Sequence, residues 1–297
     1  MVDTSRAFAQ YELARERLPK MPPRGTATHV PDMGALTARF DVFLLDAYGV
    51  LNFGATPVPG APERVAALQK AGKRVMVLTN GASFPAAISL QKYRSFGYDF
   101  APEDVISSRD IMAADLAGFP PMKWGAMAHE ASALGELGAD ITLLDDHQPS
   151  YDRAEGFLLL GAQKWSNIRQ ALLTRSLRAH PRPVLVGNPD IVAPYEHGLN
   201  INPGWYAHEL ADIAGVAPRF SGKPFAAVFE EAKHRYGDVP GSRVLMVGDT
   251  LHTDILGGAA AGVQTLLIKD YGMFRGHDVM PFIAQSGIVP DFIAPTP

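Results

Sequence analysis

The side chains best suited to chemistry in this sequence directly follow short apolar segments. Asp46 ends the run VFLL, Thr79 and Asn80 end the run VMVL, and Asp249 follows VLMVG with Asp254 shortly after it. A carboxylate can attack an electrophilic centre or bind a hard cation, and hydroxyl and amide groups can hold an anion. One apolar segment with a polar end is ordinary, but three of them together predict one shared site.

A repeating order of elements would bring these side chains together. Short apolar segments such as DVFLLD, KRVMVLT and SRVLMVG alternate with helical patterns such as PAAISLQKYRSFG. Continuously apolar strands that alternate with helices are typical of a parallel sheet covered on both faces. Ligands of such sheets bind where the carboxyl ends of the strands meet. We therefore predict an α/β fold with a Rossmann-like parallel sheet as its core.

The composition limits the classes of protein and partner. The chain has 297 residues, is 47% hydrophobic and carries a net charge of -4 without a long block of one sign, which argues against a nucleic-acid partner. It has no cysteine, which excludes disulfides and thiolate chemistry. It shows no signal-peptide pattern and no apolar run of about 18 residues. We expect a cytoplasmic protein with no membrane partner.

The pattern changes in the middle of the chain and predicts a second domain. Residues 1–39 are interpreted as an N-terminal helical arm, and residues 40–83 and 206–297 as the core domain. Residues 84–205 contain a separate series of apolar and helical segments that is too long for a loop. This stretch is expected to be an inserted α/β cap domain.

The ordered motifs resemble a known family. LLDAYGVLNFG, VLTNGAS, GNPD, GKP and VGDTLHTDI follow one another along residues 40–275. This series resembles the haloacid dehalogenase (HAD) superfamily, in particular the class whose large α/β cap follows the second motif. The resemblance implies a hydrolase of small phosphorylated metabolites, such as a sugar phosphate or a nucleotide. It also implies a possible homodimer formed through the cap.

The resemblance assigns roles to the residues of the shared edge. Asp46 would be the nucleophile that forms an aspartyl-phosphate, and Lys223 would offset the charge of the phosphate and hold Asp46. The cofactor would be Mg²⁺, bound by Asp46, Asp249 and Asp254 and by the backbone carbonyl of Tyr48. Histidines at metal-ligand spacing are absent from the sequence, so zinc is not expected.

The remaining motif residues are expected to bind the substrate. Thr79, Asn80 and Gly81 precede an expected helix, where hydroxyl, amide and backbone N–H groups can hold phosphate. Asn188 and Asp190 of the GNPD motif join them through the resemblance. Nearby residues are interpreted as structural: Ser83 as a helix cap, and His252 as a loop histidine without a special role, so these two are not assigned to the site.

Tyr48 is the main departure from the family pattern. The resembled phosphatases have an aspartate two residues after the nucleophile, where it protonates the leaving group and later activates water. General acid–base catalysis is typically worth about 10²–10⁴ in rate. A tyrosine, whose pKa is about 10 in water, can donate a proton but is a poor base at neutral pH. We therefore expect catalytic weakness with ordinary phosphate esters.

Two alternatives follow from this tyrosine. The 2-haloacid dehalogenases of the same superfamily read DAYGT at this point, attack carbon with the aspartate and use no metal. Alternatively, the chain could be a catalytically weak protein that binds a phosphorylated ligand. The intact GDTLHTD motif and the position of the insert favour a phosphatase-like hydrolase over a dehalogenase.

Overall fold

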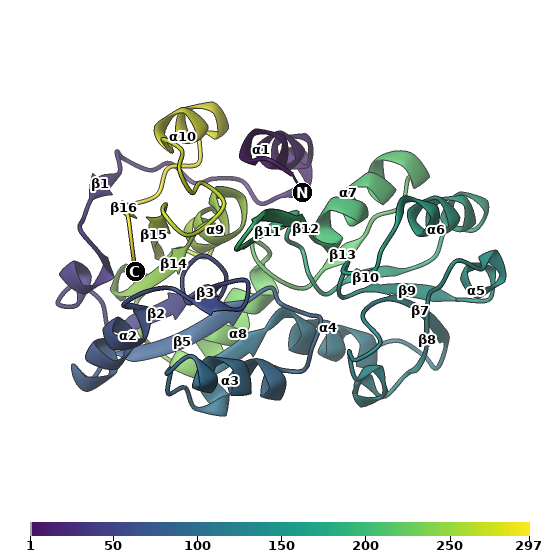
Figure 1. The fold of residues 1–297 in the computed structure, drawn as a ribbon, viewed down its shortest axis with the longest axis horizontal. Coiled ribbons are helices and arrows are strands. Elements are labelled where there is room, and N and C mark those ends of the chain that lie inside the picture. The colour runs from purple at the N-terminus through teal and green to yellow at the C-terminus, as the bar shows by residue number, and fades with distance from the viewer. Residues whose placement is uncertain (1) are drawn as a thin grey trace.

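The computed structural model describes residues 2–297 and is built around a seven-stranded parallel sheet, shown at the left of Figure 1. This architecture confirms the expected α/β core. In spatial order the strands are β1 (Thr28–His29), β16 (Phe292–Ala294), β15 (Gln264–Ile268), β14 (Val244–Gly248), β2 (Val42–Leu45), β5 (Arg74–Thr79) and β6 (Val105–Ser107).

The central strand β2 is apolar throughout because both faces of the sheet are covered. Phe43 and Leu45 belong to the apolar cluster formed with helices α2 (Ala61–Lys70) and α3 (Ala86–Ser95). Val42 and Leu44 alternate with them and belong to the cluster formed with α8 (Ala226–Tyr236). Successive side chains of a strand point to opposite faces, so this run buries one pair on each side. The other helices of this part are α9 (Leu256–Ala260) and α10 (Met280–Ser286). Helix α4 (Ser108–Ala117) follows β6 but packs Met112 and Leu116 in the apolar cluster of the second sheet, described next.

A second parallel sheet forms the other lobe, at the right of Figure 1. Its strands are β13 (Arg219–Phe220), β10 (Val184–Val186), β9 (Gly156–Leu159), β7 (Lys123–Met127) and β8 (Asp140–Leu143). Its helices are α5 (Gln148–Asp152), α6 (Asn167–Ala179) and α7 (Pro203–Ala214). A two-stranded hairpin, β11 (Val192–Tyr195) with β12 (Gly198–Ile201), lies between the two lobes.

The expected borders of the insert, residues 84 and 205, do not coincide with the borders of the two sheets. Residues 84–107 carry α3 and β6, which extend the first sheet and its apolar cover. At the other end, β13 pairs with β10 and so belongs to the second sheet. Both differences arise because strand pairing over a long distance, rather than the local pattern, decides which sheet a short segment joins.

The beginning of the N-terminal arm lies across the junction of the two lobes, whereas β1 of the same arm belongs to the first sheet. Helix α1 (Thr4–Leu13) buries Tyr11, whose hydroxyl accepts a hydrogen bond from the backbone N–H of Ile191 at 3.1 Å. Val2 forms a β-bridge with Leu199 of the hairpin. Figure 1 shows α1 between α10 of the first lobe and α7 of the second. The arm therefore contacts both lobes and the hairpin that lies between them.

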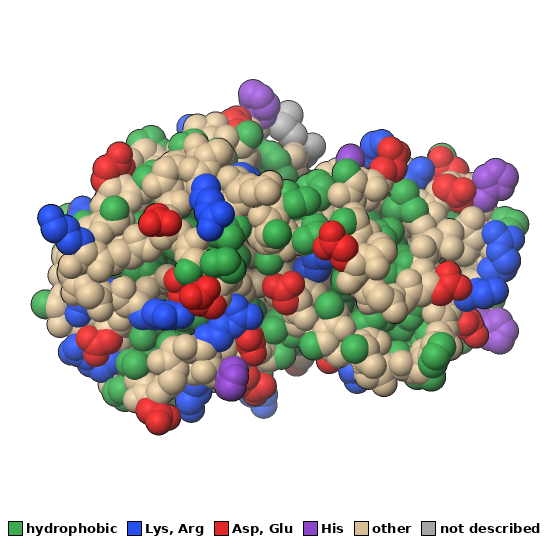
Figure 2. All heavy atoms as spheres, turned by 90° about the horizontal axis from the view of Figure 1, so that it is seen from below, with side chains coloured by type: hydrophobic (Ala, Val, Ile, Leu, Met, Phe, Trp, Pro, Cys, Tyr) green, Lys and Arg blue, Asp and Glu red, His purple; other side chains and the backbone are tan. Residues whose placement is uncertain are grey.

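The helices and the displayed surface show how apolar and charged residues are distributed in the structure. None of the helices described within residues 2–297 is long and apolar enough to cross a membrane. Figure 2 shows acidic and basic side chains interspersed over the face that it displays, without a broad area of one sign.

Replacing Tyr11 with Phe tests the contact between the arm and the segment that leads into β11. We expect Tyr11→Phe to lower the free energy of unfolding by about 1–3 kcal/mol, because the buried N–H of Ile191 loses its acceptor. Urea unfolding followed by circular dichroism measures this difference. Leu13→Ala in the same helix is the control, since Leu13 is 72% exposed and its change should stay within about 0.5 kcal/mol. A stability equal to that of the wild type in Tyr11→Phe would contradict the prediction.

Candidate active site

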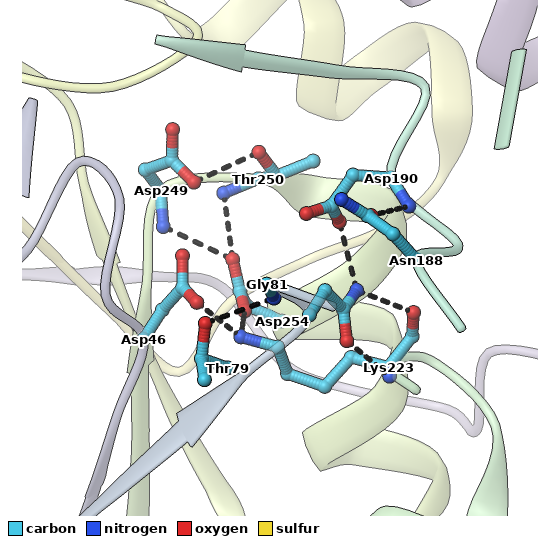
Figure 3. Close-up of polar contacts among 10 residues, drawn as sticks. Asp46, Thr79, Gly81, Asn188, Asp190, Lys223, Asp249, Thr250 and Asp254 are labelled. Carbon is cyan, nitrogen blue, oxygen red and sulfur yellow. Dashed lines mark hydrogen bonds and ion pairs between the residues drawn. The ribbon is translucent and has the colours of Figure 1, made fainter. Parts of the chain in front are cut away.

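Three carboxylates meet at the carboxyl edge of the first sheet, as the sequence predicted. Asp46 follows β2, Asp249 follows β14, and Asp254 lies in the π-helical turn Leu251–Ile255. One oxygen of each lies within 4.8 Å of the others, and all three residues are buried. Figure 3 shows the three side chains converging, with Lys223 beside them.

Backbone hydrogen bonds fix two of these carboxylates. The backbone N–H groups of Asp249 and Thr250 both donate to Asp254 Oδ2 at 3.1 Å. Asp249 Oδ1 accepts from the hydroxyl of Thr250 at 2.9 Å, and its Oδ2 accepts from the backbone N–H of Met273 at 2.7 Å. Gly49 passes so close that a Cβ there would lie 2.5 Å from Asp249 Cβ. The local chain thus leaves Asp249 and Asp254 little freedom to turn away from the site.

Lys223 supplies the positive charge at the centre of the cluster. It is 1% exposed, and its Nζ lies 2.5 Å from Asp46 Oδ1 and 2.8 Å from Asp254 Oδ1. Burial alone would lower the pKa of Lys223, but the carboxylates of Asp254 and Asp46 more than reverse this and hold its pKa above the usual value. Lys223 is therefore a permanent cation that orients Asp46.

Asn80 has a supporting position beneath this lysine. Its amide donates to Lys223 O at 2.9 Å and to Asp190 Oδ1 at 2.8 Å, and its Oδ1 accepts from Lys223 N–H at 2.8 Å. All polar atoms of the Asn80 side chain are thus engaged by the protein. This arrangement fixes Lys223 and Asp190, whereas the sequence had suggested that Asn80 contacts the substrate.

The cluster carries more negative charge than Lys223 can offset. Burial raises the pKa of Asp46 despite the attraction of Lys223, and burial together with Asp254 raises the pKa of Asp249 to about 7. Such shifts indicate that the charged forms lack compensation. A set of buried carboxylate oxygens at this spacing suits a hard divalent cation, which would supply the missing positive charge.

The other predicted substrate residues border a pocket of about 180 Å³ between the two lobes. Thr79, Gly81, Asn188 and Asp190 all line it. Thr79 Oγ1 accepts from the backbone N–H of Gly81 at 3.0 Å, and Asn188 Oδ1 accepts from that of Asp190 at 2.9 Å. Burial raises the pKa of Asp190 to about 6, although Lys223 and Asn80 partly oppose this rise. The structure thus brings both motifs to one hollow.

Tyr48 forms part of the wall of this pocket. Its ring centroid lies 5.7 Å from that of Tyr195, which comes from β11 of the hairpin. Burial, followed by the neighbouring Tyr195, raises the pKa of Tyr48 well above its usual value. The phenol therefore stays protonated throughout the physiological range, so it can donate a hydrogen bond but cannot act as a base.

Several residues of the pocket were not predicted from the sequence. Ile88, Ser89 and Lys92 come from α3, and Gln163 comes from the loop after β9 in the second lobe. Helical spacing placed the three α3 residues on one face, but the sequence alone does not say which face meets the pocket.

Two of the residues judged structural have different positions from those expected. Ser83 does not cap α3; its hydroxyl accepts from Gln163 Nε2 at 2.9 Å and so joins the two lobes. His252 is fully buried, stacks on Tyr11 with ring centroids 4.8 Å apart, and lies 2.5 Å from Glu12 Oε1 through Nε2. It therefore connects the arm to the turn that carries Asp254.

A second hairpin contacts the one that lies between the lobes. The small hairpin of the first lobe, β3 (Asn52–Phe53) with β4 (Thr56–Pro57), contacts the turn between β11 and β12. Glu196 Oε1 accepts from the backbone N–H of Ala55 at 2.7 Å and from the hydroxyl of Thr56 at 3.0 Å. These contacts join the small hairpin of the first lobe to the hairpin that lies between the lobes.

Comparison with known proteins places the chain in a family. The model of haloacid dehalogenase-like hydrolases matches residues 43–132, and a HAD-hydrolase-like model matches residues 220–295. A glycerol-3-phosphate phosphatase of Homo sapiens is 31% identical over 290 residues, covering 87% of this chain and 89% of that protein. The chain belongs to the haloacid dehalogenase-like hydrolases and is a hydrolase.

Solved structures share this fold. A crystal structure of a possible sugar phosphatase of the HAD superfamily from Cytophaga hutchinsonii superposes with a TM-score of 0.79. It is 24% identical, and the match covers 91% of this chain and 98% of that one. A glycerol phosphate phosphatase of Mycobacterium tuberculosis in complex with magnesium is 28% identical, with a TM-score of 0.62. That match covers 78% of this chain and 69% of the other.

Metal addition at two pH values tests the charge balance of the cluster. Because the pKa of Asp249 is raised, the metal-free folded protein keeps a proton on this group between about pH 4 and pH 7. The unfolded chain has already lost that proton over the same pH range. This contribution to stability is present below about pH 4 and disappears as the pH rises through about 7. A divalent cation needs the deprotonated carboxylates, so MgCl₂ should raise the unfolding temperature more at about pH 8 than at about pH 6.

Thermal unfolding monitored by circular dichroism provides this measurement. Asp249→Asn is the matched variant, because it removes both the titrating group and one candidate ligand. The larger magnesium effect at high pH should disappear in it. A magnesium effect that is the same at both pH values in the wild type would show that the raised pKa does not govern cation binding.

Proposed function

We propose that this protein is a magnesium-dependent phosphatase of a small phosphorylated metabolite, acting through an aspartyl-phosphate on Asp46. The observation that carries the proposal is the buried ion pair between Lys223 and Asp46, which is 2.5 Å long. Asn80 connects Lys223 to Asp190, a residue that lines the small pocket. A carboxylate held by a permanent cation next to such a pocket is suited to nucleophilic attack on a bound anion.

The reaction on Asp46 has two steps. In the first step an Asp46 oxygen forms a bond to phosphorus while the bond between phosphorus and the leaving oxygen breaks, and the released alkoxide takes a proton. In the second step water attacks the phosphorus and frees inorganic phosphate and the Asp46 carboxylate. Lys223 donates to Asp46 and faces the developing charge on phosphate, and Thr79 and Asn188 can hold the other phosphate oxygens.

The cation has a supporting role in this proposal. Mg²⁺ held by Asp46, Asp249 and the carbonyl of Tyr48, with Asp254 beside them, would neutralise charge on the phosphate. The donor set supports this ion because magnesium prefers carboxylate and carbonyl oxygens. The magnesium-bound relative from Mycobacterium tuberculosis gives further support.

Pocket size and relatives support a small substrate. A pocket of about 180 Å³ is small compared with ordinary ligand sites of about 300–1,000 Å³. The human relative acts on glycerol 3-phosphate according to its name, a molecule of this scale. The dehalogenase alternative is less well supported, because a metal-free attack on carbon gives no reason for three clustered carboxylates.

Metal removal and Asp46→Asn test this proposal together. Hydrolysis of p-nitrophenyl phosphate should vanish with a chelator and return with Mg²⁺, because the uncompensated carboxylates would repel the phosphate. Asp46→Asn should retain less than a few per cent of the wild-type rate, since an amide cannot replace the attacking carboxylate. The release of p-nitrophenol measures both effects.

The control for this pair is Asp99→Asn, which changes an exposed carboxyl group outside the pocket and should keep the wild-type rate. Activity that persists in chelator would overturn the metal dependence. Substantial turnover by a folded Asp46→Asn variant would show that Asp46 is not the nucleophile.

Leaving-group dependence tests the role of Tyr48. If the missing aspartate limits the rate, aryl phosphates should react much faster than alkyl phosphates, because their leaving groups depart without a proton. Tyr48→Asp should then raise alkyl phosphate hydrolysis, with an upper limit of about 10²–10⁴. Steady-state release of phosphate from both substrate types measures the ratio.

Tyr48→Phe is the complementary variant. A slower alkyl phosphate reaction in Tyr48→Phe would mean that the phenol donates the proton, and an unchanged rate would mean that it only packs. Rapid alkyl phosphate hydrolysis by the wild type, together with a loss in Tyr48→Asp, would contradict the idea of a missing acid.

A further inference from the structure

Lys92 is a pocket residue whose ammonium group has no ion-pair partner in the described part of the chain. Its side chain is half-buried in the wall formed by α3. Within residues 2–297 its ammonium group forms no ion pair, and Asp46 is the carboxylate whose charge acts on its pKa. Lys223, in contrast, contacts two carboxylates directly. Lys92 is therefore a separate positive charge, outside the carboxylate cluster.

Aromatic rings hold this ammonium group in place. Its Nζ lies 4.8 Å from the ring centroid of Tyr48, 5.4 Å from that of Tyr93 and 5.9 Å from that of Phe96. Contacts with ring faces offset part of the cost of burying a cation, but they do not replace an anionic partner. Burial accordingly lowers the pKa of Lys92 to about 8. An anion bound in the pocket would supply the missing partner.

The rest of the α3 wall has no charge. Ile88 and Ser89 border the pocket beside Lys92, and Tyr195 and Gln163 face it from the hairpin and the second lobe. In the proposed function, Lys223 and the cation bound by the carboxylates already neutralise the charge of the scissile phosphate. A ligand whose phosphate occupies that end must place its remaining atoms among the residues of these walls.

We propose that Lys92 determines specificity by binding a carboxylate on the part of the substrate that leaves, so that the preferred substrates are small phosphorylated hydroxy acids. This inference rests on the proposed function and names the substrate class of the same site. A carboxylate suits the position better than a second phosphate because the pocket of about 180 Å³ is small. An ammonium-to-carboxylate hydrogen bond inside a partly buried pocket corresponds to about a tenfold to hundredfold preference.

A matched pair of substrates isolates this interaction. Glycerol 3-phosphate and 3-phosphoglycerate share a three-carbon skeleton, but one ends in a hydroxymethyl group and the other in a carboxylate. The quantity to measure is the ratio of kcat/KM for 3-phosphoglycerate to that for glycerol 3-phosphate. This ratio cancels any effect that a variant has on folding, on Asp46 or on the scissile phosphate.

Three variants complete the experiment. Lys92→Met keeps the length and the packing against the aromatic rings but removes the charge, and it should lower the ratio about tenfold to hundredfold. Lys92→Arg keeps the charge and should retain most of the preference. Lys70→Met changes an exposed lysine at the end of α2 and should leave the ratio at the wild-type value.

An unchanged ratio in Lys92→Met would overturn the inference. If the ratio stayed the same because both rates fell equally, Lys92 would be assigned to the scissile phosphate. Failure of the proposed function looks different. In that case p-nitrophenyl phosphate, glycerol 3-phosphate and 3-phosphoglycerate would all resist hydrolysis in the presence of Mg²⁺. Calorimetric binding of 3-phosphoglycerate and glycerol 3-phosphate to the wild type and Lys92→Met would then still test the preference for the carboxylate.

Discussion

The buried contact of Lys223 with Asp46 and Asp254 is the interaction on which the rest of the structure depends. A lysine that is 1% exposed is stable only with paired carboxylates, and clustered carboxylates require a cation in return. Each partner comes from a different part of the chain, so the ion pairs form only when the parallel sheet is complete. Asn80 adds two hydrogen bonds to the backbone of Lys223 and fixes its direction. The charge balance of the site therefore depends on the folding of the core, and the core cannot bury Lys223 without its two carboxylate partners.

The junction between the lobes has its own set of contacts, which surround the site. The arm reaches both lobes: Arg6 lies over the ring of Trp205 in α7, and Thr4 donates to the backbone of Met273 in the first lobe. Glu196 holds the small hairpin of the first lobe from the opposite direction. Polar contacts such as these are individually modest, but together they fix how the two lobes meet. The arrangement around the site thus depends on segments that carry none of the family motifs.

The sequence was sufficient for the core and for the position of the carboxylate cluster. Continuous apolar runs such as VFLL predict buried parallel strands, and polar residues at their ends predict one edge, which is where Asp46, Asp249 and Lys223 lie. These predictions succeed because strand burial and strand-end position are local properties that the order of residues records directly. The motif residues Thr79 and Asn188 also reach the pocket that the sequence had suggested.

Only the tertiary structure decided the borders of the lobes, the supporting contacts and the walls of the pocket. The sheet joined by β6 or β13 depends on pairing with a distant strand, and the burial of His252 depends on an arm more than two hundred residues away. Lys92 looks like any helical lysine in the sequence, and its isolation from carboxylates becomes visible only when Tyr48 and Tyr93 surround it. The sequence by itself thus determined the fold class and the reactive edge, because local patterns encode them, whereas packing between distant segments decided what lies around that edge.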